Sequence, residues 1–334
     1  MVSLKYMNNE HDIVAIGDSV IEPFIRLTLG HEQTDEHGGE LCIPFGTKIP
    51  YESATLIAGV GNAANAAVSA SRIGLKVALV TFLGNDSYGL ECINSLIRNG
   101  VDMSYASQQD GKKTNYHYVL WHGEERTILI KHEKFDYKLP DIGNPKWLYF
   151  SSVAEHTEAF HAEVAEYLKS HPDVRLAFQP GTFQMKMGTE LLKDIYARTE
   201  VFCANKEEYE LILNMKGSNV KDMMDKMQTL GPKIVLLSDG PHGAYMKSDG
   251  KYYSVPLYPD IAPPLERTGA GDAFASTFVS YLAKGSSPEE ALLRAPINSM
   301  NVNQHVGAQE GLLAYEKIEE YLKSAPSEYK LTEI

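Results

Sequence analysis

Residues 266–274 join a glycine turn to the start of a helix and leave one carboxylate there. Gly269, Ala270 and Gly271 are small enough for several backbone N–H groups to point into one cavity, and the helix adds the positive end of its dipole. We therefore expect an anion such as phosphate to bind there. Asp272 follows at once, where it could accept the proton of a hydroxyl that attacks this phosphate, and we predict that it is a catalytic base. The alternative that Asp272 only caps the helix stays open.

The composition excludes several kinds of protein. The net charge of −13 over 334 residues argues against a nucleic-acid-binding surface, so any phosphate site must be local. No apolar run approaches the ~18 residues that would span a membrane, and the N-terminus resembles no signal peptide, so we expect neither a membrane partner nor export. Cys42, Cys92 and Cys203 are widely spaced, which is typical of a reducing cytoplasm, and we interpret them as packing residues.

Short apolar runs alternate with helical patterns along the chain. The runs that predict strands are 13–16, 77–83, 147–150, 174–178, 201–204 and 234–237. This alternation predicts an α/β fold with a mainly parallel sheet and helices on both faces, so that ligands gather at the carboxyl ends of the strands. Apolar spacing after the glycine turn predicts a helix over about 271–284.

Two regions, about 18–55 and 112–133, interrupt the alternation. Residues 116–121 and 126–130 flank a turn, which predicts a hairpin outside the main sheet. Between these regions, Gly59-x-Gly61-x-x-Ala64 matches a dinucleotide-binding fingerprint. We reject that interpretation because the next strand ends without the required acidic residue and because no strand of convincing length is expected before Gly59.

The turn at 266–274 resembles the signature Asp-Thr-x-Gly-Ala-Gly-Asp of the PfkB/ribokinase family of small-molecule kinases, and further stretches similar to that family follow in the expected order. The resemblance implies one PfkB kinase domain over residues 1–334. Its fold would be a ribokinase-like three-layer sandwich with a mainly parallel central sheet and a small β-sheet lid formed by about 18–55 and 112–133. It also implies ATP-dependent transfer of the γ-phosphate to a hydroxyl of a sugar or sugar-like molecule, dependence on Mg²⁺, and a homodimer through the lid.

On the acceptor side, Gly61 and Asn65 match the family motif Gly-Gly-x-x-x-Asn, with Val60 in place of the first glycine. The resemblance implies that this motif hydrogen-bonds the acceptor's hydroxyls, which suits the donors and acceptor of an asparagine. After the first strand, the family presents an Asp to a substrate hydroxyl, and here either Asp18 or Glu22 could serve.

On the nucleotide side, Asn205 and Glu208 match the motif Asn-x-x-Glu, whose Glu helps to place Mg²⁺ through water. The alternative that the two residues form a helix capping box stays open. Ser238, Gly240 and Gly243 match Thr/Ser-x-Gly-x-x-Gly, which holds the phosphates and adenosine. No P-loop sequence occurs in the chain.

Thr268 and Asn298 are also assigned to the nucleotide side by the resemblance. Besides Val60, the sequence departs from the family at three places. Glu266 replaces the usual Asp and Gly311 lies where ribokinases offer a serine, which weakens the expectation of their monovalent-cation (K⁺) site. Gln179 begins the stretch that stands where sugar kinases often read Asp-x-Asn.

Three alternatives to a kinase for free sugars stay open. A nucleoside kinase could stack its base on lid aromatics, which could equally pack the lid: Tyr116, Tyr118 and Trp121. A phosphosugar kinase needs cations near the acceptor, for which the candidates are Lys112, Lys113, Arg126 and Lys131. The third alternative is a catalytically silent sensor of a sugar or nucleotide. The chain keeps the motif residues Gly269–Asp272, Asn205 and Glu208, which such a sensor would not need, and this argues against it.

Overall fold

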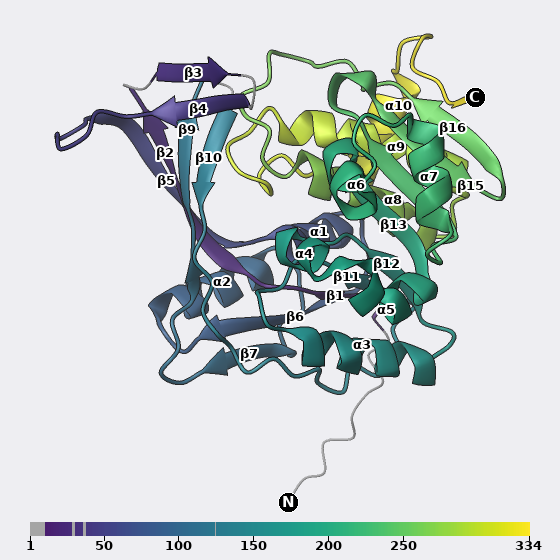
Figure 1. Ribbon diagram of the computed structural model, residues 1–334, viewed down its shortest axis with the longest axis horizontal. Helices are drawn as coiled ribbons and strands as arrows, with labels where there is room; N and C mark the ends of the chain where they lie inside the picture. The colour runs from purple at the N-terminus through teal and green to yellow at the C-terminus, as the bar shows by residue number, and fades with distance from the viewer. Residues whose placement is uncertain (1–10, 29–30, 36–37, 124) are drawn as a thin grey trace, which may run out of the picture.

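The computed structural model describes residues 11–28, 31–35, 38–123 and 125–334. The large sheet of this part comprises β1 (Ile13–Ile16), β6 (Val77–Gly84), β7 (Ala106–Gln109), β11 (Trp147–Phe150), β12 (Arg175–Phe178), β13 (Thr199–Asn205), β14 (Ile234–Ser238), β15 (Ala244–Ser248), β16 (Lys251–Val255) and β17 (Thr332–Glu333). Its order is β17-β16-β15-β14-β13-β12-β11-β1-β6-β7 (Figure 1). The strands from β14 to β7 are parallel, whereas β15, β16 and β17 extend one edge antiparallel. The six strands predicted from apolar runs are all present.

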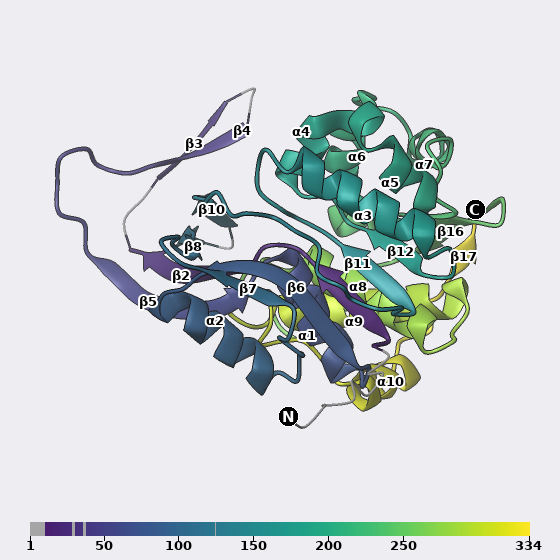
Figure 2. The same ribbon diagram turned by 90° about the horizontal axis from the view of Figure 1, so that it is seen from below.

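Helices cover both faces of the large sheet (Figure 2). The helices are α1 (Asn62–Arg72), α2 (Ser87–Arg98), α3 (Glu158–Ser170), α4 (Thr182–Leu191), α5 (Lys193–Arg198), α6 (Lys206–Leu213), α7 (Val220–Gln228), α8 (Ala270–Ala283), α9 (Pro288–Val302) and α10 (Tyr315–Lys323). One core contains side chains of α1, α8, α9 and α10, and the other contains side chains of α3, α5, α6 and α7. In β14, Leu236 joins the first core while Val235 and Leu237 join the second. The strand is apolar throughout because both of its faces are buried.

A smaller sheet stands apart from the large one (Figure 1). It comprises β2 (Val20–Leu27), β5 (Tyr51–Val60), β8 (Asn115–Tyr116), β9 (Tyr118–His122) and β10 (Glu125–Leu129). The order is β10-β9-β2-β5, and β8 pairs with β2. These strands come mainly from the two regions that interrupt the alternation, and β9 and β10 form the predicted hairpin. A separate hairpin joins β3 (His31–Asp35) and β4 (Gly38–Cys42).

One expectation about this smaller sheet was wrong. The ten-residue strand β5 runs up to and through Gly59, where no strand of convincing length was expected. Residues 51–56 of β5 are exposed to solvent. Because neither face of that stretch is buried, its sequence carries no apolar alternation by which the strand could be found.

The structure bears on two expectations from the composition. Among the described residues, no helix combines the length and the apolar character that crossing a membrane would require. Cys42, Cys92 and Cys203 are all free thiols. Cys92 is buried in the small cluster around Ile21 and Leu83, as expected of a packing residue, whereas Cys203 also lines a cavity.

Candidate active site

Two neighbouring cavities lie where β13 and β14 end. The first, the Asp272 cavity, has a volume of about 290 Å³, and its walls include Glu22, Gly61, Asn62, Asn65, Gln179, Cys203, Glu208, Thr268, Gly269 and Asp272. The second, the Gly243 cavity, has a volume of about 410 Å³, and its walls include Gly240, Gly243, Leu257, Tyr258, Phe274, Pro296 and Met300. Both cavities are lined by Arg126, Asn205, Ser238, Arg267 and Gly271. The end of β13 and the end of β14 therefore lie at their junction.

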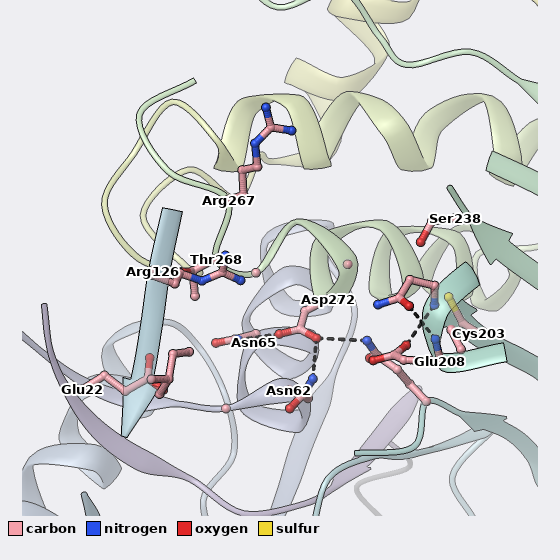
Figure 3. Close-up of a pocket in the computed structure, with 17 residues that line it drawn as sticks. Glu22, Asn62, Asn65, Arg126, Cys203, Glu208, Ser238, Arg267, Thr268 and Asp272 are labelled. Atoms are coloured by element: carbon pink, nitrogen blue, oxygen red, sulfur yellow. Dashed lines mark hydrogen bonds between the residues drawn. The ribbon is translucent and has the colours of Figure 1, made fainter. Parts of the chain in front are cut away.

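Asp272 lies in the first turn of α8 and its carboxylate faces the first cavity (Figure 3). Three carboxamides from other elements donate to it. Nδ2 of Asn62 lies 2.9 Å from Oδ1, Nδ2 of Asn65 lies 2.8 Å from Oδ2, and Nε2 of Gln179 lies 3.0 Å from Oδ1. The N-cap of α8 is Gly269, which makes no side-chain cap bond. The capping alternative therefore does not describe the contacts of Asp272.

A second layer of hydrogen bonds orients two of these carboxamides. The hydroxyl of Tyr149 donates to Oε1 of Gln179 at 2.5 Å. Nε2 of Gln309 donates to Oδ1 of Asn65 at 3.0 Å and to the carbonyl of Gly59 at 2.8 Å. Because each amide oxygen is occupied by a donor, each amide nitrogen is left to face Asp272.

The surroundings raise the pKa of two carboxyl groups at this site. Burial raises the pKa of Asp272 above its ordinary value, the three carboxamide donors oppose this effect, and the charge of Glu22 adds to it. Burial also raises the pKa of Glu208, the N–H of Asn205 lowers it, and the charge of Asp272 raises it further. A carboxylate with a raised pKa is a better proton acceptor, which suits a general base.

The turn before α8 presents backbone donors to the same cavity. Gly269 has a left-handed φ of 82°, and a Cβ there would lie 2.3 Å from the Cβ of Ala308, so glycine is required. The first N–H groups of a helix lack intrahelical partners, so those of residues 270–272 are available to an anion. The hydroxyl oxygen of Thr268, also at this turn, is buried without a partner among the described residues.

Glu266 holds this turn from behind. Its Oε2 accepts from the N–H of Thr268 at 2.6 Å, and its Oε1 accepts from the N–H of Gly307 at 2.7 Å. The carbonyl of Gly311 accepts from Nδ2 of Asn301 at 2.7 Å. Glu266 and Gly311, the two residues that differ from the ribokinase cation site, thus both accept hydrogen bonds from other parts of the protein. Among the described residues, no three His, Cys, Asp or Glu side chains cluster as metal ligands.

Asn205 and Glu208 form the capping box of α6. Oδ1 of Asn205 accepts from the N–H of Glu208 at 2.8 Å, and Oε2 of Glu208 accepts from the N–H of Asn205 at 2.9 Å. Both residues also line the Asp272 cavity. The capping interpretation is therefore confirmed, and it does not exclude a metal-placing role, because Glu208 keeps a second carboxylate oxygen.

The residues assigned to the acceptor are placed differently from one another. Gly61, Asn65 and Glu22 line the Asp272 cavity. Gly61 has a φ of 120°, and a Cβ there would lie 2.5 Å from the carbonyl oxygen of Asp18. The Asp18 side chain does not line this cavity, and its carboxylate accepts from the hydroxyl of Tyr137 at 2.8 Å. Of these two carboxylates, Glu22 therefore lines the cavity, although it is buried and one of its oxygens also lies 3.2 Å from Nδ1 of His117.

The residues assigned to the nucleotide also separate into two groups. Ser238, Gly240 and Gly243 line the Gly243 cavity, and Thr268 lines the Asp272 cavity next to it. Asn298 lines neither cavity. It is fully buried, and its Nδ2 donates to Oγ1 of Thr277 at 2.7 Å. In the structure, Asn298 of α9 therefore makes a hydrogen bond that links α9 to α8.

Sequence reasoning missed part of the site. Asn62 was not selected, although it lies three residues before Asn65 and so on the same face of α1. Gln309 and Arg267 were also missed, and no local pattern marks them. Gln179 was noted only as the replacement of a carboxylate, whereas the structure places it on Asp272. Four cationic side chains were considered as binders of a phosphosugar: Lys112, Lys113, Arg126 and Lys131. Of these, only Arg126 lines the Asp272 cavity.

Comparison with known proteins agrees with this arrangement. The sequence matches the pfkB family carbohydrate kinases over residues 14–314. It is 25% identical to ribokinase of Bacillus subtilis (78% of this chain, 87% of the relative) and 25% identical to 5-dehydro-2-deoxygluconokinase of Clostridium tetani (80% and 85%). Ribokinase of Arabidopsis thaliana, solved with ribose and ATP, superposes with a TM-score of 0.77 at 18% identity, covering 94% of this chain and 99% of that one. The chain therefore belongs to the pfkB family of carbohydrate kinases.

Proposed function

We propose that this protein transfers the γ-phosphate of ATP to a hydroxyl group of a sugar or sugar-like small molecule. The observation that carries the proposal is the Asp272 carboxylate, which faces a cavity beside the unpaired N–H groups of a helix start. A base and an anion site this close together suit phosphoryl transfer. The small sheet acts as the lid of a single kinase domain, because Glu22 of β2 and Arg126 of β10 line the cavity.

The acceptor occupies the Asp272 cavity. Its walls offer carboxylates and carboxamides, and no aromatic side chain is among its described lining residues. Such walls match a polyhydroxylated molecule, with Glu22, Gly61 and Asn65 as contacts. The nucleoside alternative receives no support here, because the three lid aromatics proposed to stack on a base line neither cavity: Tyr116, Tyr118 and Trp121.

ATP occupies the Gly243 cavity, whose glycine turn and apolar wall suit phosphates and a base, respectively. Ser238, Gly240 and Gly243 bind it, and its γ-phosphate lies toward Thr268. Mg²⁺ fits the site, because Glu208 is a half-buried carboxylate that lines the cavity with one oxygen not used in the capping box. When bound, Mg²⁺ screens the charge of the phosphates.

Asp272 accepts the proton of the acceptor hydroxyl as this oxygen forms a bond to the γ-phosphorus. The bond between the γ-phosphorus and the oxygen of ADP breaks in the same transfer. The N–H groups of Gly269, Ala270, Gly271 and Asp272 stabilise the charge on the moving phosphoryl group. Asn62, Asn65 and Gln179 hold the carboxylate in position while it takes up the proton.

The protein acts as a homodimer in the cytoplasm. Tyr51, Leu56, Tyr118 and Leu129 of the small sheet are exposed, which supports a second copy covering this sheet. Three free cysteines support a reducing compartment. Light scattering of the purified protein should give twice the mass of the chain, and Leu56→Lys should reduce that mass to one chain.

The experiment that tests the function measures ADP release from MgATP with free sugars, sugar acids, phosphosugars and nucleosides. We expect turnover with sugars and its loss in Asp272→Asn. Turnover with nucleosides alone would replace the sugar assignment. Stoichiometric binding of a sugar without ADP release would favour the sensor alternative over a kinase.

A further inference from the structure

Arg126 is the residue through which the small sheet reaches both cavities. It lies on β10 and pairs in register with Trp121 of β9. Of the five residues shared by the two cavities, the other four belong to the large-sheet side of the site. Figure 3 shows the Arg126 side chain extending from β10 toward Thr268, on the side of the cavity that holds Asp272.

The Arg126 guanidinium has no partner within the described part of the chain. Its Nε is buried and makes no hydrogen bond. An arginine remains charged at any physiological pH, and a partly buried charge without a partner is costly. Its planar donors fit the oxygens of a phosphoryl or carboxylate group. This arginine is therefore suited to an anion that enters from solution.

Two anions could bind Arg126, and its position favours one of them. A charged group on the acceptor would meet Arg126 only from within the Asp272 cavity. The phosphoryl group, in contrast, moves from the Gly243 cavity to the Asp272 cavity, and Arg126 lines both. During this transfer negative charge spreads over three oxygens, which an arginine fork can bind.

We propose that Arg126 is a further catalytic residue, which binds the transferring phosphoryl group from the small sheet. The proposal rests on the kinase function proposed above. Because Arg126 belongs to the lid and Asp272 to α8, the charge-stabilising site is complete only when the small sheet lies in the position seen here. Transfer to an acceptor is thereby coupled to the placement of the lid.

The test compares Arg126→Gln and Arg126→Lys with Arg26→Gln as a matched control. Arg26 also lies on the small sheet, but it stacks on the Trp121 ring at 4.7 Å and pairs with Glu52 at 3.2 Å, outside both cavities. We expect Arg126→Gln to lower kcat by at least about 100-fold for every acceptor that the wild type uses. Arg126→Lys should recover part of this loss, and Arg26→Gln should retain wild-type kcat.

A binding measurement separates this inference from the proposed function. The wild type should bind MgADP more tightly when aluminium fluoride, a mimic of the transferring phosphoryl group, is added with the acceptor. Arg126→Gln should keep its affinity for MgADP and lose this gain. An unchanged gain in Arg126→Gln would overturn the inference, as would a rise in KM for anionic acceptors alone with kcat intact. Absence of turnover in the wild type would instead count against the proposed function.

Discussion

Asp272→Asn isolates the proton-accepting role of the carboxylate from its place in the fold. Asparagine has nearly the same shape, so the N–H groups of the turn remain in place, although its NH₂ group must face at least one of the carboxamide donors Asn62, Asn65 and Gln179. General base catalysis contributes ~10²–10⁴-fold, or about 3–5.5 kcal/mol of barrier. Because the anion site and the metal site stay intact, we expect kcat to fall by about 10³-fold. A coupled assay of ADP release measures this loss.

Two further measurements separate a catalytic base from a structural acid. Asp272 does not line the Gly243 cavity, so the affinity for MgADP should stay the same. Its folded pKa is raised, so the ionised form lowers the free energy of unfolding at any pH above the ordinary aspartate pKa. The amide removes that penalty, but its NH₂ group faces a carboxamide donor and loses a hydrogen bond there. Because these two effects oppose each other, the variant should unfold at a temperature close to that of the wild type.

Asp222→Asn is the matched control, because Asp222 also lies in the first turn of a helix, α7, and outside both cavities. Its kcat should equal that of the wild type. If Asp272→Asn kept kcat within about tenfold of the wild type, Asp272 would not be the base. If it lost activity together with unfolding temperature, a structural role would explain the result instead.

Three other predictions follow from the contacts of the site. Gln179→Leu removes a donor that lowers the pKa of Asp272, so the acid limb of the pH profile of kcat/KM should move to higher pH; an unmoved limb would contradict the contact. Glu208→Gln can keep the capping box with Asn205, so the unfolding temperature should hold while the Mg²⁺ concentration for half-maximal activity rises about tenfold. Because both oxygens of Glu266 bind backbone N–H groups, exchange of K⁺ for tetramethylammonium should leave kcat unchanged, and K⁺ activation would refute this.

The sequence was most informative where a local pattern determines structure. Continuous apolar runs predicted the parallel strands because both faces of those strands are buried, as in β14. The glycine turn and the spacing after it predicted α8 to within one residue at each end. The family resemblance, carried by the same turn, is confirmed by the match over residues 14–314.

Contacts between distant segments were beyond such reasoning. Asn62 and Asp272 are 210 positions apart, and only the packing of α1 against α8 brings them together. Gln309 bonds Asn65 across 244 positions. A carboxamide has no distinctive sequence environment, because its role depends on which side chain faces it. Arg126 could be named as a cation of the lid, but its position between two cavities depends on how the two sheets sit together.

In the proposed mechanism, the charges of the site let proton transfer and phosphoryl transfer assist each other. Glu22 and Asp272 place negative charge on the acceptor side, which by itself repels an incoming phosphoryl group. If Asp272 is the base, uptake of the hydroxyl proton neutralises it when the new bond to phosphorus forms, so the repulsion falls as the phosphoryl group arrives. The raised pKa of Asp272 favours that protonated form. Burial is the main cause of this raised pKa and the charge of Glu22 adds to it, so the surroundings that disfavour ionised Asp272 in the empty site favour its uptake of a proton in the proposed transfer.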